Sequence, residues 1–338
     1  MGCFNLLNTI RGKKNKYFSC GYLQSSLFFD YENNVKLCPL LQDRIIVKNF
    51  NGLWLDISKI IEKRKNSVEE MKNGIIPDEC KKCHNLKNIA WHKSEYIETL
   101  YLNQWRYCYI NCCYCNSPKQ ENLIEAKHFD VMPAIEQLID KKLFTVNTKV
   151  VFECGDSCIH PEFDKLMYFF INYGMKEVTV NTPALRYCQS IADALSNNIT
   201  NVVISLDAGC AYIYERIKGL NKFDIAISNI KRYKQYEEPS QKRVILKYTI
   251  IKGINDNEKE ILDWYILSKN LGIKKLVFDI AENWFREIKD SIPDYLKEII
   301  LFVRKISDFN EIKIEFCERA AVLYNLIKNE QNQKNKEI

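Results

Sequence analysis

Four cysteines lie within eight residues of one another, in the stretch RYCYINCCYCNSPKQ that begins at Arg106. Cysteines at such short spacing can form disulfides, hold a zinc ion or ligate an iron–sulfur cluster. The chain begins without a secretory signal pattern, and no apolar stretch reaches the length needed to cross a bilayer. We therefore expect a cytoplasmic protein that does not bind a membrane, and in a reducing compartment the cluster of thiols favours a metal site over disulfides.

Cys108, Cys112 and Cys115 form the pattern C-x3-C-x2-C, with Tyr114 directly before the last cysteine. Cys113 lies inside the pattern but out of register with it. Structural zinc takes four closed ligands, and an iron–sulfur cluster usually takes four cysteines. Three thiolates therefore predict a [4Fe–4S] cluster in which one iron is open to another ligand.

The chain from Glu98 onward alternates apolar runs with amphipathic runs, which predicts a repeated strand–helix unit. Strands are expected at 98–105, 148–153, 176–181, 201–207, 243–251 and 274–280. Helices are expected at 129–143, 161–174, 185–197, 212–219, 223–235, 258–272 and 293–308. The strands are continuously apolar, as parallel strands covered on both faces are. Such an α/β chain can form a doubly wound sheet or an incomplete (β/α) barrel, and both place chemistry at the carboxyl ends of the strands, where the cysteines follow the first strand.

This cysteine pattern, with an aromatic residue before its third cysteine and a six-fold strand–helix repeat behind it, resembles the radical S-adenosylmethionine (radical SAM) superfamily. The resemblance spans roughly residues 98–280 and implies a partial (β/α)6 TIM-type barrel. It implies that Cys108, Cys112 and Cys115 ligate a [4Fe–4S] cluster whose open iron binds S-adenosylmethionine. In that family an electron from the cluster cleaves S-adenosylmethionine, and the 5′-deoxyadenosyl radical abstracts hydrogen from the substrate. A reducing partner such as flavodoxin or ferredoxin is implied as well.

Later segments resemble the cofactor-binding motifs of the same family. ECGDSCIHPEF is similar to its Gly-Gly-Glu-Pro motif, although Cys154 replaces the first glycine and Ser157 the proline. TVNTPA is similar to its Thr-Asn-Gly motif, and ISLDA to its Ser-x-Asp motif. The resemblance implies that the cofactor is contacted by Tyr114, Gly155, Asp156, Asn181, Ser205, Asp207 and Lys247. Cys210 is a candidate hydrogen donor, as in some epimerases of the family, and its alternative is a partly buried thiol.

A second group of cysteines lies nearer the N-terminus. Cys80 and Cys83 form C-x2-C, while Cys20 and Cys38 lie on either side of a predicted hairpin. This group is similar to the auxiliary iron–sulfur modules called SPASM or twitch domains, although those modules usually follow the barrel. The alternative is a structural zinc site with four cysteines, or with three cysteines and His84.

These patterns predict three segments: a cysteine-rich module at 1–92, a radical SAM core at 93–290, and a helix and strand extension at 291–338 whose polar tail from Asn329 is disordered. The accessory module favours a peptide or protein substrate, and a carbohydrate substrate for epimerisation or dehydrogenation is the alternative. A zinc-binding α/β interaction protein without catalysis is the alternative of another class. The net charge of +6 is dispersed along the chain, which argues against a nucleic-acid partner.

Overall fold

The computed structural model describes residues 18–39, 45–81, 83, 85–87, 91, 96–115, 129–308 and 312–334. The chain divides into two compact units. The described residues up to 107, together with 129–180, belong to the first unit. Residues 108–115, 181–308 and 312–334 belong to the second. Within the described part of the chain, no helix is both long enough and apolar enough to cross a membrane.

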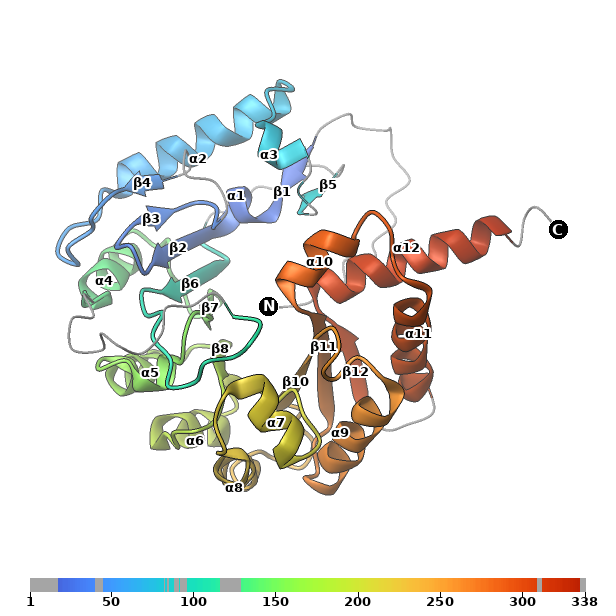
Figure 1. Cartoon of the computed structure of the whole chain (residues 1–338). Coiled ribbons are helices and arrows are strands. Elements are labelled where there is room, and N and C mark those ends of the chain that lie inside the picture. Colours follow the sequence, from blue (N-terminus) through green and yellow to red (C-terminus); the bar gives the residue numbers. More distant parts are fainter. Residues whose placement is uncertain are drawn as a thin grey trace. The chain divides into compact units, whose positions relative to one another are not determined.

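The first unit combines a short N-terminal layer with two of the predicted strand–helix repeats and most of the next strand (Figure 1). Its elements are β1 (Ser19–Cys20), α1 (Gly21–Ser25), β2 (Ser26–Asp30), β3 (Val35–Lys36), β4 (Ile45–Val47), α2 (Ile57–Lys72), α3 (Asp78–Lys81), β5 (Leu86–Lys87), β6 (Thr99–Asn103), α4 (Met132–Asp140), β7 (Lys149–Phe152), the 3₁₀ turn η3 (Ser157–Ile159), α5 (Phe163–Tyr173) and β8 (Val178–Thr182), which ends just inside the second unit. The helix α5 ends where predicted, because Gly174 adopts a left-handed conformation with φ of 75°.

Strands β2, β6, β7 and β8 pair in parallel, and β3 and β4 extend the β2 edge with antiparallel pairs. The parallel strands are apolar and buried along most of their length, as sequence predicts for strands covered on both faces. Phe28 of β2 stacks on Tyr101 of β6 with ring centroids 4.2 Å apart. The hairpin expected between Cys20 and Cys38 is the β2–β3 pair, and it is confirmed.

The second unit continues the alternation of strands and helices (Figure 1). Its elements are α6 (Gln189–Ser196), β9 (Thr200–Ser205), α7 (Ala211–Lys218), α8 (Phe223–Lys234), β10 (Val244–Ile250), α9 (Glu258–Asn270), β11 (Lys275–Ile280), α10 (Glu282–Ile288), α11 (Asp294–Asp308), β12 (Lys313–Phe316) and α12 (Glu318–Lys334). Strands β9, β10, β11 and β12 pair in parallel. Tyr248, Trp264 and Phe278 form part of the core between β10, β11 and α9.

The predicted fold class is confirmed: parallel strands alternate with helices, as expected of an α/β fold of the partial (β/α)6 type. Two local expectations differ from the structure. The N-terminal segment contributes β2 to the parallel sheet, which the interrupted sequence pattern did not indicate. The helix α12 continues through residue 334, so that the part of the tail beginning at Asn329 is helical, and Glu330 pairs with Lys297 of α11 at 2.9 Å. Residues 335–338 lie outside the described residues.

Candidate active site

The predicted cluster ligands lie on residues 108–115, here called the cysteine loop, which follows the carboxyl end of β6. The side chains of Cys108 and Cys112 are half-buried, and those of Cys113 and Cys115 are exposed. The backbone N–H of Cys115 donates to the carbonyl of Cys112 at 3.1 Å, which closes a tight turn around the last two predicted ligands. The loop thus presents thiols of mixed exposure at the strand end where the sequence predicted them.

The segment just before the cysteine loop is fixed by the turn after β7. The N–H of Asp156 donates to the carbonyl of Tyr107 at 2.8 Å. Gly155 has φ of 61°, and a Cβ there would lie 2.5 Å from the backbone of Arg106 and of Tyr107. Only glycine fits both this conformation and this approach. Gly155 and Asp156 therefore hold the entry of the cysteine loop, and Asp156 is itself fully buried, with its carboxylate accepting from the N–H of Cys158.

The loop itself is fixed by the carboxyl end of α7. The N–H of Asn111 donates to the carbonyl of Lys218 at 3.2 Å, and the N–H of Cys113 donates to the carbonyl of Ile217 at 2.9 Å. Gly219, with φ of 71°, lets the helix end at this point, and a Cβ there would lie 3.2 Å from the carbonyl oxygen of Asn111. The unsatisfied carbonyls at the end of a helix thus find their donors in the cysteine loop.

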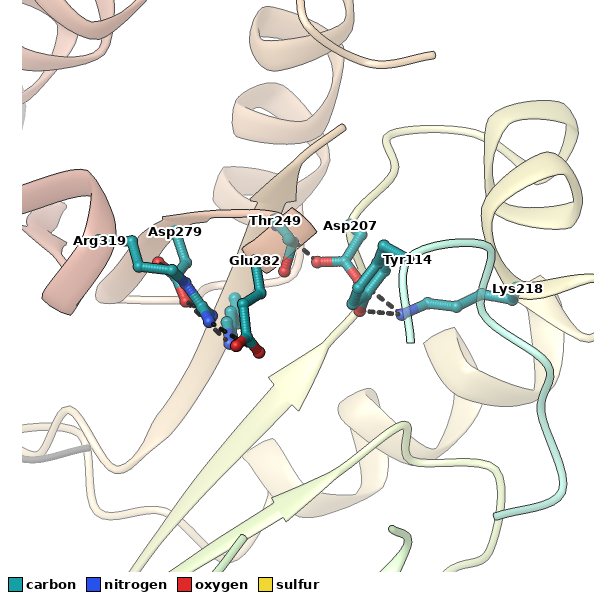
Figure 2. A network of polar contacts seen from close by, with 8 residues as sticks. Tyr114, Asp207, Lys218, Thr249, Asp279, Glu282 and Arg319 are labelled. Atoms are coloured by element: carbon teal, nitrogen blue, oxygen red, sulfur yellow. Dashed lines mark hydrogen bonds and ion pairs between the residues drawn. The ribbon is translucent and has the colours of Figure 1, made fainter. Parts of the chain in front are cut away.

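A buried network joins the loop to α7 and to the turn after β9 (Figure 2). The Tyr114 hydroxyl donates to Asp207 Oδ2 at 2.7 Å, and Lys218 Nζ reaches the same oxygen at 2.5 Å. The other carboxylate oxygen of Asp207 accepts from the N–H of Thr249 at 2.7 Å. The side chains of Asp207 and Lys218 are both fully buried. The prediction assigned Tyr114 and Asp207 to the cofactor, whereas in the structure both oxygens of Asp207 are engaged within the protein.

The charges of this network act on the neighbouring groups. Burial alone would lower the pKa of Lys218, but the negative charge of Asp207 raises it well above its usual value, so the ammonium stays charged. Burial and the charge of Asp207 raise the pKa of the Tyr114 hydroxyl. Burial raises the pKa of the Cys112 thiol, and the positive charge of Lys218 is the strongest effect in the opposite direction.

A second polar network lies at the carboxyl ends of β10, β11 and β12. Asp279 is fully buried and is contacted by Lys247 Nζ at 3.5 Å and by Arg319 at 2.5 Å. Arg319 also approaches Glu282 at 3.8 Å (Figure 2). Both cations hold the pKa of Asp279 below its usual value in spite of its burial. Lys247 faces Ser205 in the β9–β10 register, so the structure brings these two predicted residues to neighbouring positions.

The remaining predicted residues of the second unit are placed separately. Asn181 lies in β8 and is half-buried. Cys210 is exposed and precedes the first residue of α7 as its N-cap. An exposed thiol at the carboxyl side of β9 is compatible with the predicted hydrogen donor, which stays a prediction.

Strand pairing in the first unit joins Cys20 to the segment that follows Cys80 and Cys83. Cys20 of β1 pairs with Leu86 of β5, and the N–H of Leu86 donates to the carbonyl of Cys83 at 3.1 Å. The N–H of Cys83 in turn donates to the carbonyl of Cys80 at 3.0 Å. Burial raises the pKa of the Cys20 thiol, and the nearby Cys38 and Cys83 thiols raise it further. The predicted alternative ligand His84 lies outside the described residues.

The fit of these residues to a metal group can be judged from their surroundings. Among the described residues, no three histidine, cysteine or acidic side chains converge to hold a single metal ion. The hydroxyl of Tyr214 is buried, has no hydrogen-bond partner among the described residues, and is close enough to Cys108 and Cys112 for both thiols to raise its pKa. A buried donor and a buried cation behind three thiols fit an anionic iron–sulfur cluster.

Sequence reasoning missed two residues of α7, Tyr214 and Lys218. A signal for them was present, because Tyr214, Ile217 and Lys218 follow helical spacing and share the buried face of α7. A lysine on such a face needs a buried partner, and Asp207, in the turn before α7, is that partner in the structure.

Residues 102–265 match the family described as the radical SAM superfamily. GTP 3′,8-cyclase of Haemophilus influenzae is 23% identical to this chain over 159 residues, which are 46% of this chain and 46% of that protein. A Staphylococcus epidermidis protein described as probable dual-specificity RNA methyltransferase RlmN is 23% identical over 208 residues, covering 57% of this chain and 56% of that protein. The chain thus spans about half the length of these curated relatives.

Among solved structures, Streptococcus suis SuiB bound to the precursor peptide SuiA has a similar fold, with a TM-score of 0.50 and 13% sequence identity. The similarity covers 79% of this chain and 65% of SuiB. At this identity the likeness is one of fold. The matched family covers β6 through α9, the segment in which the sequence placed the cysteine triad and most of its accompanying motifs. The chain therefore contains a radical SAM domain, over residues 102–265.

Proposed function

We propose that this chain binds a [4Fe–4S] cluster through Cys108, Cys112 and Cys115 and reductively cleaves S-adenosylmethionine to abstract hydrogen from a peptide or protein substrate. The observation that carries the proposal is the cysteine loop, whose three thiols are presented at the carboxyl end of β6 in a segment that matches the radical SAM superfamily. When bound, the cluster supplies the electron that splits S-adenosylmethionine into methionine and a 5′-deoxyadenosyl radical. A reducing protein such as flavodoxin or ferredoxin would deliver that electron in a cytoplasmic setting.

The chain's own residues are proposed to hold the loop and orient the cofactor. Gly155 and Asp156 fix the residues that enter the loop, and the carboxyl end of α7 fixes its middle. Ser205 and Lys247 occupy neighbouring strand positions, where a hydroxyl and an ammonium can bind the polar end of the cofactor. The carboxylate of Asp207 is proposed to act through Tyr114 and Lys218.

The N-terminal cysteine group is proposed to hold an auxiliary iron–sulfur cluster. Cys20, Cys38 and Cys83 interact electrostatically, and Cys80 lies next to Cys83 through a backbone hydrogen bond. Zinc is the alternative occupant. This accessory group is what favours a peptide or protein substrate, and the fold likeness to SuiB, whose structure contains a precursor peptide, is compatible with it.

A nucleotide or RNA substrate is the second candidate, because the two relatives at 23% identity are named for GTP and RNA chemistry. A carbohydrate is a third substrate class that the sequence left open. Mass spectrometry separates these classes when a peptide, a nucleotide or RNA, and a sugar are supplied in turn. Only the true substrate should stimulate 5′-deoxyadenosine formation and change in mass itself. Stimulation by GTP or RNA and not by peptides would replace the peptide proposal.

The central test uses anaerobically reconstituted full-length protein, reduced and supplied with S-adenosylmethionine. We expect iron and sulfide to be bound and 5′-deoxyadenosine to form. Cys108→Ala, Cys112→Ala and Cys115→Ala should each abolish the product, while Cys113→Ala, on the same loop, should retain it. Colourless protein with stoichiometric zinc and no cleavage would support the non-catalytic zinc protein instead.

A further inference from the structure

The face of α7 that lies behind the cysteine loop carries polar groups that no motif of the loop explains. Tyr214 and Lys218 are four residues apart on this helix and both are fully buried. The Tyr214 hydroxyl has no hydrogen-bond partner among the described residues. A buried hydroxyl without a partner costs free energy, so its retention calls for an acceptor.

The position of the Tyr214 hydroxyl indicates where that acceptor would be. Burial raises its pKa to about 12; the charge of Lys218 opposes this rise, and the Cys112 and Cys108 thiols add to it. In the structure Tyr214 lies on the same buried face of α7 as Ile217 and Lys218, one turn before the two carbonyls that accept from the N–H groups of Cys113 and Asn111 in the cysteine loop. Sulfur atoms of an iron–sulfur cluster accept hydrogen bonds, and such bonds raise the reduction potential of the cluster.

Lys218 adds a fixed positive charge to the same face. Its ammonium bonds Asp207 at 2.5 Å and lies 3.4 Å from the Tyr114 hydroxyl, while its carbonyl accepts from the N–H of Asn111. A buried ion pair is seldom more stable than apolar residues of the same size. The buried Lys218–Asp207 pair thus contributes little to the free energy of folding, yet Lys218 contacts the loop through its side chain and its backbone.

We infer that α7 tunes the cluster held by the cysteine loop: Tyr214 donates a hydrogen bond to a cluster or cysteine sulfur, and the Lys218 ammonium offsets the negative charge of the thiolates. Both are positioning residues, and both favour the reduced, more negative state of the cluster. The inference rests on the proposed function, because it assumes a cluster on Cys108, Cys112 and Cys115.

The test is the reduction potential of the cluster in anaerobically reconstituted full-length protein, followed by electron paramagnetic resonance. The signal that changes on adding S-adenosylmethionine identifies the cluster of the cysteine loop. Tyr214→Phe removes only the hydroxyl and should lower the potential while iron content stays at the wild-type level. Tyr233→Phe, which removes a buried hydroxyl of α8 that bonds the carbonyl of Arg186, should leave the potential unchanged.

Lys218→Met should lower the reduction potential of the cluster and should lower the iron bound per chain about twofold. Lys218→Arg keeps the positive charge and should bring the reduction potential back toward that of the wild type. Lys234→Met, which breaks the ion pair between the last residue of α8 and Glu237, is the matched control and should change neither. If Lys218→Met does not fold, Lys218→Gln, which removes the positive charge and keeps a donor toward Asp207, is the second lysine variant and should show the lower potential. Wild-type potentials in folded Tyr214→Phe and in the folded lysine variant would overturn the inference. Wild-type protein that binds no cluster would instead defeat the proposed function.

Discussion

The two cysteine groups of this chain are assembled in different ways. The cysteine loop gathers Cys108, Cys112 and Cys115 on eight consecutive residues. The N-terminal group draws Cys20, Cys38, Cys80 and Cys83 from separate segments, and the β1–β5 pair and short turns join Cys20 with Cys80 and Cys83. The first group depends on the backbone that holds one loop, and the second depends on tertiary pairing.

The two cysteine groups also differ in the backbone structure that holds them in place. The loop is held by backbone hydrogen bonds from the end of α7, and the residues just before it are held by the turn after β7. The N-terminal group relies on a pair of two-residue strands, with Ser19 and Cys20 opposite Lys87 and Leu86. Two-residue strands contribute little stability by themselves, so a bound metal group would supply part of the folding free energy there.

The sharpest way to separate the two groups is to remove one ligand from each. Cys112→Ala should abolish cleavage of S-adenosylmethionine, because no other described residue of the loop offers a thiolate at that position of the C-x3-C-x2-C pattern. Cys83→Ala should lower the iron bound per chain, by about half, and should retain cleavage measured as 5′-deoxyadenosine without substrate. Iron analysis and the cleavage assay on the same preparations check both outcomes.

Loss of cleavage in Cys83→Ala with full iron content would mean that the two groups do not act separately. Iron content unchanged in Cys83→Ala, with zinc lost instead, would assign the N-terminal group to zinc.

The next expected effect concerns the entry of the cysteine loop. A methyl group at Gly155 would lie 2.5 Å from the backbone of Arg106 and Tyr107, so the segment must move by about 1 Å to reach ordinary contact. A displacement of that size next to a reacting centre can cost on the order of 100-fold in rate. Gly155→Ala should therefore lower cleavage by that order, measured at saturating S-adenosylmethionine.

Gly174→Ala is its control in the same unit. Gly174 also has positive φ, at 75°, but a Cβ there meets no atom within 4 Å. It should lose stability from backbone strain, about 1 kcal/mol, and keep its cleavage rate. A Gly155→Ala enzyme as active as Gly174→Ala would show that the Gly155 contact does not position the loop.

The sequence predicted the local parts of the fold and of the site. The alternation of apolar and amphipathic runs from Glu98 onward follows from the periods of strands and helices, and the C-x3-C-x2-C spacing needs only one loop. The structure therefore differs from most expected strand and helix limits by a few residues. The end of α5 at Gly174 could be read directly, because a glycine after an amphipathic run ends a helix.

Contacts between distant segments could not be predicted in the same way. Nothing local in LFFD indicates that β2 pairs in parallel with β6, about seventy residues later. The bonds of Asp207 and Tyr114 to each other and to Lys218 were hidden for the same reason: the motif positions were visible, but the bonds depend on how α7 packs. Spacing identifies ligands on one loop, and packing decides which polar groups stand behind them.

The smallest expected effect tests whether the end of α7 matters to the loop. Gly219 and Gly253 share φ of 71°, but a Cβ at Gly219 would lie 3.2 Å from the Asn111 carbonyl, and one at Gly253 would meet nothing within 4 Å. Alanine at either position should cost about 1 kcal/mol of stability from backbone strain. Only Gly219→Ala should also lower cleavage, by a few-fold, because the carbonyl of Asn111 must yield by a few tenths of an ångström. Thermal melts and cleavage rates of the two variants check this, and equal cleavage rates would mean that the end of α7 does not position the loop.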